Sequence, residues 1–169
     1  MSSQTEQTTL VTLLLRSIRA YQRHKRRKGP WAVMNRKLAR FSRNVLSILT
    51  ASDIDVDTQL GRNLRLPHPT GVVTHGKVVI GDDCLIMQQV TIGLIADEGV
   101  PHIGSRVYIG SGAKVLGPIK IGDGAAIGAN AVVLCDVPPR ATAVGVPARI
   151  VEKKGVDSAT SAILNAADR

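Results

Sequence analysis

Apolar residues recur at two different spacings along this chain, and the change of spacing divides it in two. In residues 1–50 they recur every three or four positions, which predicts two helices separated by Gly29–Pro30. The polar residues 1–9 are predicted to lie outside both helices. From Ile54 onward an apolar residue recurs every six positions, and Gly often follows it. These thirteen anchor positions fall into three blocks of constant phase: Ile54, Leu60, Leu66 and Val72; Ile80, Ile86 and Ile92; Ile103, Ile109, Val115, Ile121, Ile127 and Val133.

A six-residue period is typical of a solenoid in which each repeat supplies one short strand and one turn. The first and fifth positions of each repeat then point inward and stack on their counterparts in the next coil. The fifth positions are also apolar or small, at Leu64, Cys84, Val90, Val107, Ala113, Ile119, Ala125, Ala131 and Val137. We therefore predict an all-β parallel β-helix over residues 53–151, with a short helical segment at 1–52 and a polar tail at 152–169.

The phase of the repeat slips twice, and each slip predicts a loop that leaves the column. The step from Val72 to Ile80 is eight residues, and the step from Ile92 to Ile103 is eleven. Extra residues cannot fit within a coil of fixed length, so the segment Leu94–His102 is expected to project outward. Loops that project from a rigid scaffold often carry binding residues.

Composition narrows the kind of core and the kind of partner. Aromatic residues make up only 2% of the chain, so the core is expected to consist of Ile, Val, Leu and Ala. The net charge of +9 is concentrated in residues 1–50, which hold eleven Lys or Arg and one acid, whereas the remainder holds eleven bases and twelve acids. This basic segment could attract an anionic membrane surface or nucleic acid, or could be a solvated helix face. The scarcity of aromatic rings makes nucleic acid the least favoured partner.

The cysteines and the N-terminal residues bear on the cell compartment. Cys84 and Cys135 are too few and too far apart to predict a disulfide framework or a metal site, and both are expected to be buried as small apolar residues. No secretory signal is expected, because the apolar run Leu10–Leu15 is short and the charges follow it. No stretch approaches the length of a membrane span. The sequence therefore predicts a cytoplasmic protein.

Four segments of the repeat region carry a resemblance to a known family. They are LPHPTGVVTHG at 66–76, QQVTIG at 88–93, PHIGSRVYIGSGAKVLG at 101–117 and VPPRATAVGVPARIV at 137–151. In these segments the chain resembles the hexapeptide-repeat acyltransferases, and within them the serine O-acetyltransferase-like branch. The resemblance implies a left-handed β-helix, a homotrimer with active sites between neighbouring columns, acetyl-CoA as the acyl donor, and no metal. The chain is accordingly expected to be an O-acetyltransferase.

The resemblance also implies a general base. Motif matching places the catalytic His of the family at His68, and an imidazole can take the proton of an acceptor hydroxyl near neutral pH. The alternative is a His in a coil turn with no chemical role. Asp53 matches a family Asp at the entry to the first coil and could bind the acceptor, or it could be a solvated or capping residue. His102, at the end of the loop, is the other candidate for binding the acceptor, and it could instead meet the donor. His75 and His102 are rivals of His68 for a place in the site.

Residues that would contact the donor are likewise implied by the resemblance. Ser111 and Ala129 match positions where small residues let the pantetheine arm of acetyl-CoA approach the backbone. Gly93 begins the loop that is expected to flank the thioester. Arg149 and Lys153 lie near the end of the last coil, where they could meet the phosphates of CoA or simply be solvated.

The chain departs from the serine enzymes at two positions near the expected site. The family commonly has Asp immediately before the catalytic His, where this chain has Pro67, and a His that lies near the acceptor carboxylate aligns with Val100. The acceptor could therefore be serine or a saccharide hydroxyl, as in the exopolysaccharide acetyltransferases, which share this motif set. Basic N-terminal helices could hold such an enzyme near an anionic membrane surface. A non-catalytic β-helix that serves as a scaffold is the alternative from another functional class.

Overall fold

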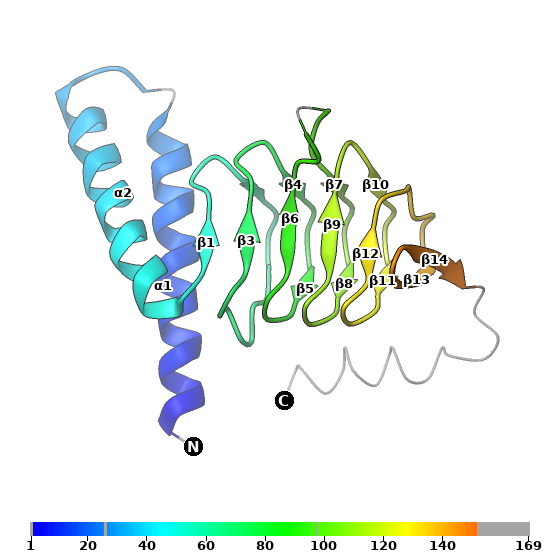
Figure 1. Cartoon of the computed structure of the whole chain (residues 1–169). Helices are drawn as coiled ribbons and strands as arrows, with labels where there is room; N and C mark the ends of the chain where they lie inside the picture. The colour runs from blue at the N-terminus through cyan, green and yellow to red at the C-terminus, as the bar shows by residue number, and fades with distance from the viewer. Residues whose placement is uncertain (1, 26, 97, 152–169) are drawn as a thin grey trace.

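The protein is a column of β-coils with a pair of helices at one end. The computed structural model describes residues 2–25, 27–96 and 98–151, and Figure 1 shows the helices at the N-terminal end of the column. The predicted parallel β-helix and helical N-terminal segment are confirmed. The predicted tail at 152–169 lies outside the described residues, and the division of the chain into domains at residue 52 stays a prediction.

The two helices are α1 (Ser2–Lys25) and α2 (Pro30–Thr50). The break between them falls at Gly29, whose φ of 119° is disfavoured for any residue with a Cβ, and Pro30 begins α2, where a missing amide hydrogen costs nothing. The prediction that residues 1–9 lie outside the helix is wrong, because α1 already begins at Ser2. Once a helix is nucleated each added residue gains a hydrogen bond, so polar residues can extend it.

Within the described residues, fourteen short strands form the three faces of the column. Sheet A contains β1 (Asp53–Ile54), β3 (Val73–Thr74), β6 (Thr91–Gly93), β9 (Lys114–Leu116) and β12 (Val132–Val133). Sheet B contains β2 (Gln59–Leu60), β4 (Val79–Ile80), β7 (His102–Ile103) and β10 (Lys120–Ile121). Sheet C contains β5 (Leu85–Ile86), β8 (Tyr108–Ile109), β11 (Ala126–Ile127), β13 (Thr142–Gly145) and β14 (Ala148–Val151).

The coil is left-handed, as the resemblance implies. In Figure 1 the chain climbs sheet A at the front, crosses over the top to the back, and returns along the bottom while it advances from β1 towards β12. Neighbouring strands are parallel and in register, so that Ile92 of β6 pairs with Thr74 of β3 and with Val115 of β9. Among the described strands the exception is β14, which pairs antiparallel with β13 at one edge of sheet C.

Aliphatic side chains stacked along the axis form the core. All the predicted anchors are buried except the half-buried Leu60, and all nine predicted fifth positions are buried. No aromatic ring belongs to the core that the described residues form, so the predicted aliphatic core is confirmed. Cys84 is buried as predicted, and burial raises the pKa of its thiol. The prediction is wrong for Cys135, which is exposed because it lies in a corner two residues after the anchor Val133.

One predicted anchor is out of register by two residues. Thr74, not Val72, pairs with Ile54 in the preceding coil and with Ile92 in the following coil. Val72 is also fully buried and lies two residues before the true anchor. Because it is apolar and Thr74 is not, the sequence pattern assigned the anchor position to Val72.

The first phase slip therefore begins earlier than predicted. The eight-residue step runs from Leu66 to Thr74, so the extra residues lie in the corner at 67–71. Thr74 can occupy an inward position because its hydroxyl is 2.8 Å from the hydroxyl of Thr58, and both side chains are buried. A hydrogen bond between the two hydroxyls avoids the free-energy cost of burying either one alone.

Replacing Thr74 by valine is expected to lower the free energy of unfolding by about 1 kcal/mol, because the buried hydroxyl of Thr58 then keeps only its longer hydrogen bond, to the carbonyl oxygen of His75 at 3.3 Å. The double variant Thr58→Val/Thr74→Val should regain most of that loss, since neither hydroxyl is then buried. Urea unfolding followed by circular dichroism measures both variants. Strict additivity of the two single losses would contradict the coupling between the hydroxyls.

Helix α1 covers the open end of the column. Val11, Leu14, Leu15 and Ile18 are buried in the same apolar cluster as Ile54 of the first coil. A solenoid needs such a cap, since its terminal coil has no neighbour on one side to bury its apolar face.

Helix α2 lies farther from the column than α1 over most of its length (Figure 1). It buries Ala32 and Ala39. By contrast, the apolar residues whose spacing predicted this helix are exposed, namely Val33, Leu38, Phe41, Val45 and Ile48. Neither helix, over the residues that are described, is long and apolar enough to cross a membrane. The helix itself was predicted correctly, but the described residues leave its apolar face exposed.

Candidate active site

Three of the predicted site residues, His68, Ser111 and Ala129, lie on one edge of the column. This C–A edge is the corner where the chain passes from sheet C to sheet A, at the bottom of Figure 1. Backbone hydrogen bonds link its successive corners, for instance from the amide of Asn130 to the carbonyl oxygen of Ser111 at 2.8 Å. Ser111 is half-buried and Ala129 is exposed, so a ligand can approach the backbone along this edge. The edge consists of the corners 67–71, 87–89, 110–112 and 128–130.

His68 lies in the first of these corners, which the phase slip lengthens. It is flanked by Pro67 and Pro69, and each proline fixes its own φ and restricts the backbone of the residue before it. Pro69 is buried, and its carbonyl oxygen accepts a hydrogen bond from the amide of Val72 at 3.0 Å, whereas His68 is exposed. The imidazole forms no hydrogen bond with any described residue, so both ring nitrogens are open to a substrate.

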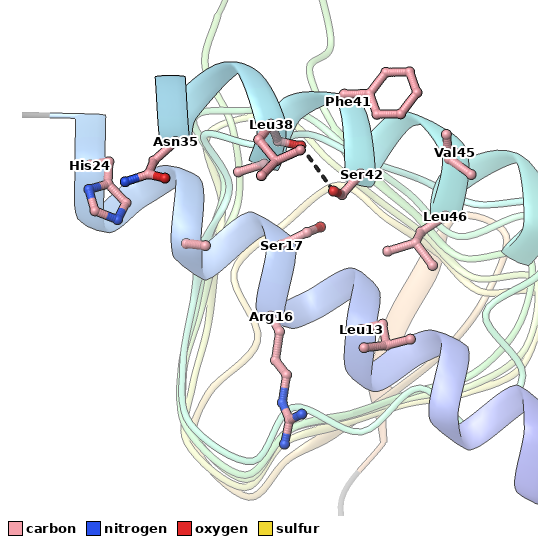
Figure 2. A pocket seen from close by; sticks show the side chains of 12 residues that line it. Leu13, Arg16, Ser17, His24, Asn35, Leu38, Phe41, Ser42, Val45 and Leu46 are labelled. Atoms are coloured by element: carbon pink, nitrogen blue, oxygen red, sulfur yellow. Dashed lines mark hydrogen bonds between the residues drawn. The ribbon is translucent and has the colours of Figure 1, made fainter. Parts of the chain in front are cut away.

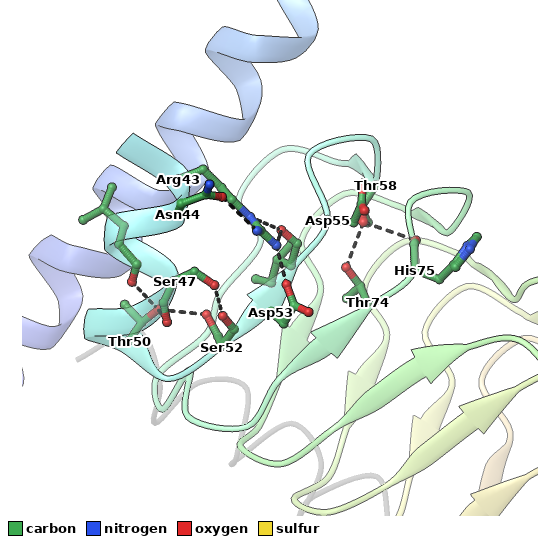
Figure 3. Close-up of polar contacts among 12 residues, drawn as sticks. Arg43, Asn44, Ser47, Thr50, Ser52, Asp53, Asp55, Thr58, Thr74 and His75 are labelled. Atoms are coloured by element: carbon green, nitrogen blue, oxygen red, sulfur yellow. Dashed lines mark hydrogen bonds and ion pairs between the residues drawn. The ribbon is translucent and has the colours of Figure 1, made fainter. Parts of the chain in front are cut away.

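Asp53 lies beside the same corner, but its carboxylate has a partner. The Asp53 amide donates to the carbonyl oxygen of Val72 at 2.8 Å, which places Asp53 next to the corner that carries His68. Its carboxylate forms an ion pair with Arg43 of α2 (Figure 3). The Arg43 guanidinium also donates to the carbonyl oxygen of Ile54, from Nε at 2.9 Å and from Nη2 at 2.7 Å. Arg43 thus joins α2 to the first coil and holds Asp53.

Arg43 and Gln88 were not predicted from the sequence. Arg43 is one of eleven bases in residues 1–50, and nothing in the sequence distinguishes it from its neighbours. Gln88 lies in the next corner of the C–A edge, and its Oε1 atom is buried with no hydrogen-bond partner among the described residues. Both features depend on which segments pack together, so no local sequence signal could have revealed them.

Two other predicted residues lie on a different edge, the A–B edge, where the chain passes from sheet A to sheet B. Gly93 ends β6 and opens the loop at 94–101, which projects from the top of the column as predicted (Figure 1). A Cβ added at Gly93 would meet no atom within 4 Å, so the space beside it is open. His102 begins β7, where its side chain is exposed. Sheet A therefore separates Gly93 and His102 from His68 within one chain.

His75 also lies on the A–B edge. Its Nδ1 accepts a hydrogen bond from the amide of Lys77 at 3.2 Å, which leaves Nε2 to carry the proton of the neutral ring. It lines a cavity of about 480 Å³ together with Asp57 and Lys25, whose charged groups are 2.8 Å apart. The hydrogen bond to Asp57 raises the pKa of Lys25. Because the A–B edge and the C–A edge lie on opposite sides of sheet A, His75 is separated from His68 by the width of that sheet.

The remaining predicted positions lie elsewhere. Arg149 is an exposed residue of β14, opposite Val144 of β13, and Lys153 lies outside the described residues. Val100, which aligns with an acceptor-site His of the serine enzymes, is buried in the core. Within the described residues, no three His, Cys, Asp or Glu side chains gather in a way that could hold a metal ion. A cavity of about 670 Å³ between α1 and α2 contains none of the predicted site residues (Figure 2).

Comparisons with known proteins lead to the same family as the motifs. The profile of the bacterial transferase hexapeptide family (six repeats) matches residues 101–135. A serine acetyltransferase from Salmonella typhimurium is 43% identical over 148 residues, which is 86% of this chain. The chain belongs to the hexapeptide-repeat acyltransferases. Within this family it falls in the serine acetyltransferase-like branch, so the resemblance carried by the motifs is confirmed.

Solved structures of this branch share the fold. A serine acetyltransferase from Brucella abortus in complex with coenzyme A superposes with a TM-score of 0.72 at 33% identity and covers 83% of this chain. The soybean serine acetyltransferase complexed with serine superposes with a TM-score of 0.65 at 44% identity and covers 72%. The chain spans about half the length of these relatives: 54% of the Salmonella protein, 55% of the Brucella chain and 51% of the soybean chain.

Proposed function

We propose that this protein is an acetyl-CoA-dependent O-acetyltransferase in which His68 acts as the general base. The observation that carries the proposal is the placement of His68, whose exposed imidazole has no partner among the described residues and is held between two prolines on the C–A edge. Asp53 lies beside the same corner. Similar serine acetyltransferases have been solved with coenzyme A and with serine, which supports a thioester donor and a hydroxyl acceptor.

The proposed reaction needs one proton to move twice. The neutral imidazole of His68 takes the proton of the acceptor hydroxyl while the hydroxyl oxygen bonds to the thioester carbonyl carbon of acetyl-CoA. The tetrahedral intermediate then breaks its carbon–sulfur bond, and the imidazolium returns the proton to the departing thiolate. A side chain that changes charge close to neutral pH suits both steps.

Small residues along the C–A edge support the placement of the donor. Ser111 and Ala129 carry short side chains at accessible corners, so the pantetheine arm can lie against the backbone there. Arg149 and Lys153 would meet the phosphates of CoA. The Asp53 carboxylate, which Arg43 holds, would receive the acceptor beside His68.

A homotrimer would complete the site, because sheet A keeps His68 apart from Gly93 and His102 within one chain. A three-fold arrangement in which the C–A edge of one column meets the A–B edge of the next would bring these residues together. We expect sedimentation equilibrium to give the mass of three chains under assay conditions. Full activity in a preparation that sediments as a monomer would contradict this arrangement. The predicted cytoplasmic location stays a prediction.

A thiol-release assay with acetyl-CoA tests the function and the acceptor together. We expect serine to be acetylated faster than homoserine or a panel of sugars, because the chain is 43% identical to a serine acetyltransferase. The observation that favours the saccharide alternative is the loss of two polar positions of the serine enzymes, at Pro67 and at the buried Val100. Faster turnover with a sugar would assign the chain to that alternative. Absence of acetyl-CoA binding in calorimetry would instead favour a non-catalytic scaffold.

A further inference from the structure

The outward face of α2 is apolar although nothing in the described chain covers it. Six residues recur at spacings of three and four and therefore lie on one side of the helix. Trp31, Ile48 and Phe41 are exposed to 81%, 80% and 66%. Monomeric proteins rarely expose a continuous apolar surface of this kind without a partner for it. We call this face the outer stripe; it consists of Trp31, Met34, Leu38, Phe41, Val45 and Ile48.

The outer stripe also contains the rarest residues of the chain. Trp31 and Phe41 are the only Trp and the only Phe of the chain, and neither belongs to the core, which is aliphatic. Their positions on the surface of α2 are not required for packing, since the helix buries Ala32 and Ala39 instead. Trp and Phe on one face of an amphipathic helix are typical of helices that lie in a membrane interface.

A groove continues the apolar surface from α2 onto α1. The cavity between the helices is lined by Leu13 and Ser17 of α1 and by Leu38, Val45 and Leu46 of α2. Figure 2 shows Leu13 and Leu46 between the two helices, whereas the ring of Phe41 points outward. The stripe and the groove therefore form one surface at the end of the molecule that is farthest from β14.

The segment that carries this surface is rich in basic residues. Residues 1–50 hold eleven bases and one acid. Some of these bases have acceptors in the first coil, such as Arg43, but others form no ion pair within the described residues, namely Arg16, Arg23, Arg27, Lys28 and Lys37. Lys37 lies one turn before Phe41 on the same helix, and Arg16 lines the groove. Bases without ion pairs among the described residues, in the same segment as an apolar stripe, complement a surface that is anionic outside and apolar beneath.

We propose that the outer stripe of α2 docks this protein on an anionic lipid surface. Trp31 and Phe41 enter the boundary between headgroups and acyl chains, and Lys37 contacts the headgroups. A second copy is a poorer occupant of the stripe, because two such faces would bring two uncompensated basic segments together. The proposal does not depend on the acceptor or on the identity of the general base.

The single tryptophan provides the probe. The full 169-residue chain is titrated with vesicles of phosphatidylcholine alone and of equal parts phosphatidylcholine and phosphatidylglycerol, and Trp31 emission is recorded. We expect emission to move to shorter wavelength, and the protein to sediment with the vesicles, only when phosphatidylglycerol is present. Raising the salt concentration should reverse the binding, since salt screens the attraction between the bases and the headgroups.

Matched variants separate docking from simple adsorption of a basic protein. Phe41→Ser should lower the partition coefficient for anionic vesicles more than about tenfold, because the variant lacks the aromatic side chain that enters the membrane. Leu134→Ser removes a residue that is 46% exposed on the column and should leave the coefficient unchanged. Lys37→Gln should lower it about fivefold, the effect of one base near a charged membrane, while Lys120→Gln should not change it.

Three outcomes would overturn the proposal. The first is no shift of Trp31 emission with anionic vesicles. The second is binding that Phe41→Ser leaves intact, which would show adsorption through charge alone. The third is a fall in assembly mass for Phe41→Ser in sedimentation velocity without any vesicle binding by the unchanged protein, which would assign the stripe to a second copy. Acetyl transfer to a soluble acceptor should be the same in Phe41→Ser and the unchanged protein, so failure of docking and failure of the proposed function are distinguishable.

Discussion

Replacing His68 by alanine is expected to lower turnover of acetyl-CoA by about 10²–10⁴-fold, the range typical of a lost general base. The loss should appear in kcat more than in KM, because the base acts in the chemical step. The His68 side chain is exposed and has no hydrogen-bond partner among the described residues, so the free energy of unfolding should change by less than about 0.5 kcal/mol. Thiol release at saturating donor and acceptor gives kcat, and urea unfolding gives the stability.

His75→Ala is the matched control for this variant. His75 is the same residue type, but the Lys77 amide occupies its Nδ1 and it lines the cavity of Lys25 and Asp57, so its loss should lower kcat far less than the loss of His68. Near-normal turnover in His68→Ala would remove the assignment of His68 as general base. A loss of turnover in His68→Ala that is accompanied by dissociation of the assembly would point to a structural role for the corner at 67–71.

Replacing Gly81 by alanine is expected to lower the free energy of unfolding by about 3 kcal/mol. A Cβ at Gly81 would lie 2.6 Å from the carbonyl carbon and oxygen of Gly104 in the next coil. That backbone cannot move freely, because the Gly81 amide donates to the carbonyl oxygen of Ile103 at 2.9 Å and so holds the two coils together. Overpacking against a fixed backbone costs about 1–3 kcal/mol or more. The midpoint and slope of urea unfolding measure the loss.

Gly93→Ala is the matched control for stability. Gly93 is also in the solenoid, but an added Cβ would meet no atom within 4 Å, and its φ does not fall in the left-handed region. The change should therefore be near zero or stabilising by about 0.4–1 kcal/mol, since alanine reduces the entropy of the unfolded chain. Equal losses in Gly81→Ala and Gly93→Ala would show that the contact between coils is not the cause.

The fold could be predicted in detail because its constraints repeat. Ile109 and Ile127 occupy equivalent places eighteen residues apart and pair directly in sheet C, so every coil repeats the same requirement for an inward aliphatic side chain. The predicted anchor was wrong in one coil, where the polar residue Thr74 occupies the inward position. Thr74 is an anchor only because the hydroxyl of Thr58 lies beside it, and that contact joins two residues that are sixteen positions apart in the sequence.

The candidate site could be predicted only in part. The sequence motif singled out His68, and the structure places Ser111 and Ala129 on the same edge. The contact of Arg43 with Asp53 could not be predicted, because it requires α2 to lie against the first coil. The separation of His102 from His68 by sheet A could not be predicted either, since it depends on which face of the coil each residue occupies.

The sequence by itself determined the six-residue coil, the inward positions, the projecting loop after Gly93 and the presence of two helices. These features follow from local periodicity, which sets the face of an element on which a side chain lies. Only the tertiary structure decided the true place of the first phase slip, the capping of the column by α1 and the exposure of the α2 stripe. Periodicity shows that a residue such as Phe41 belongs to an apolar face, but what covers that face depends on contacts between segments far apart in the chain.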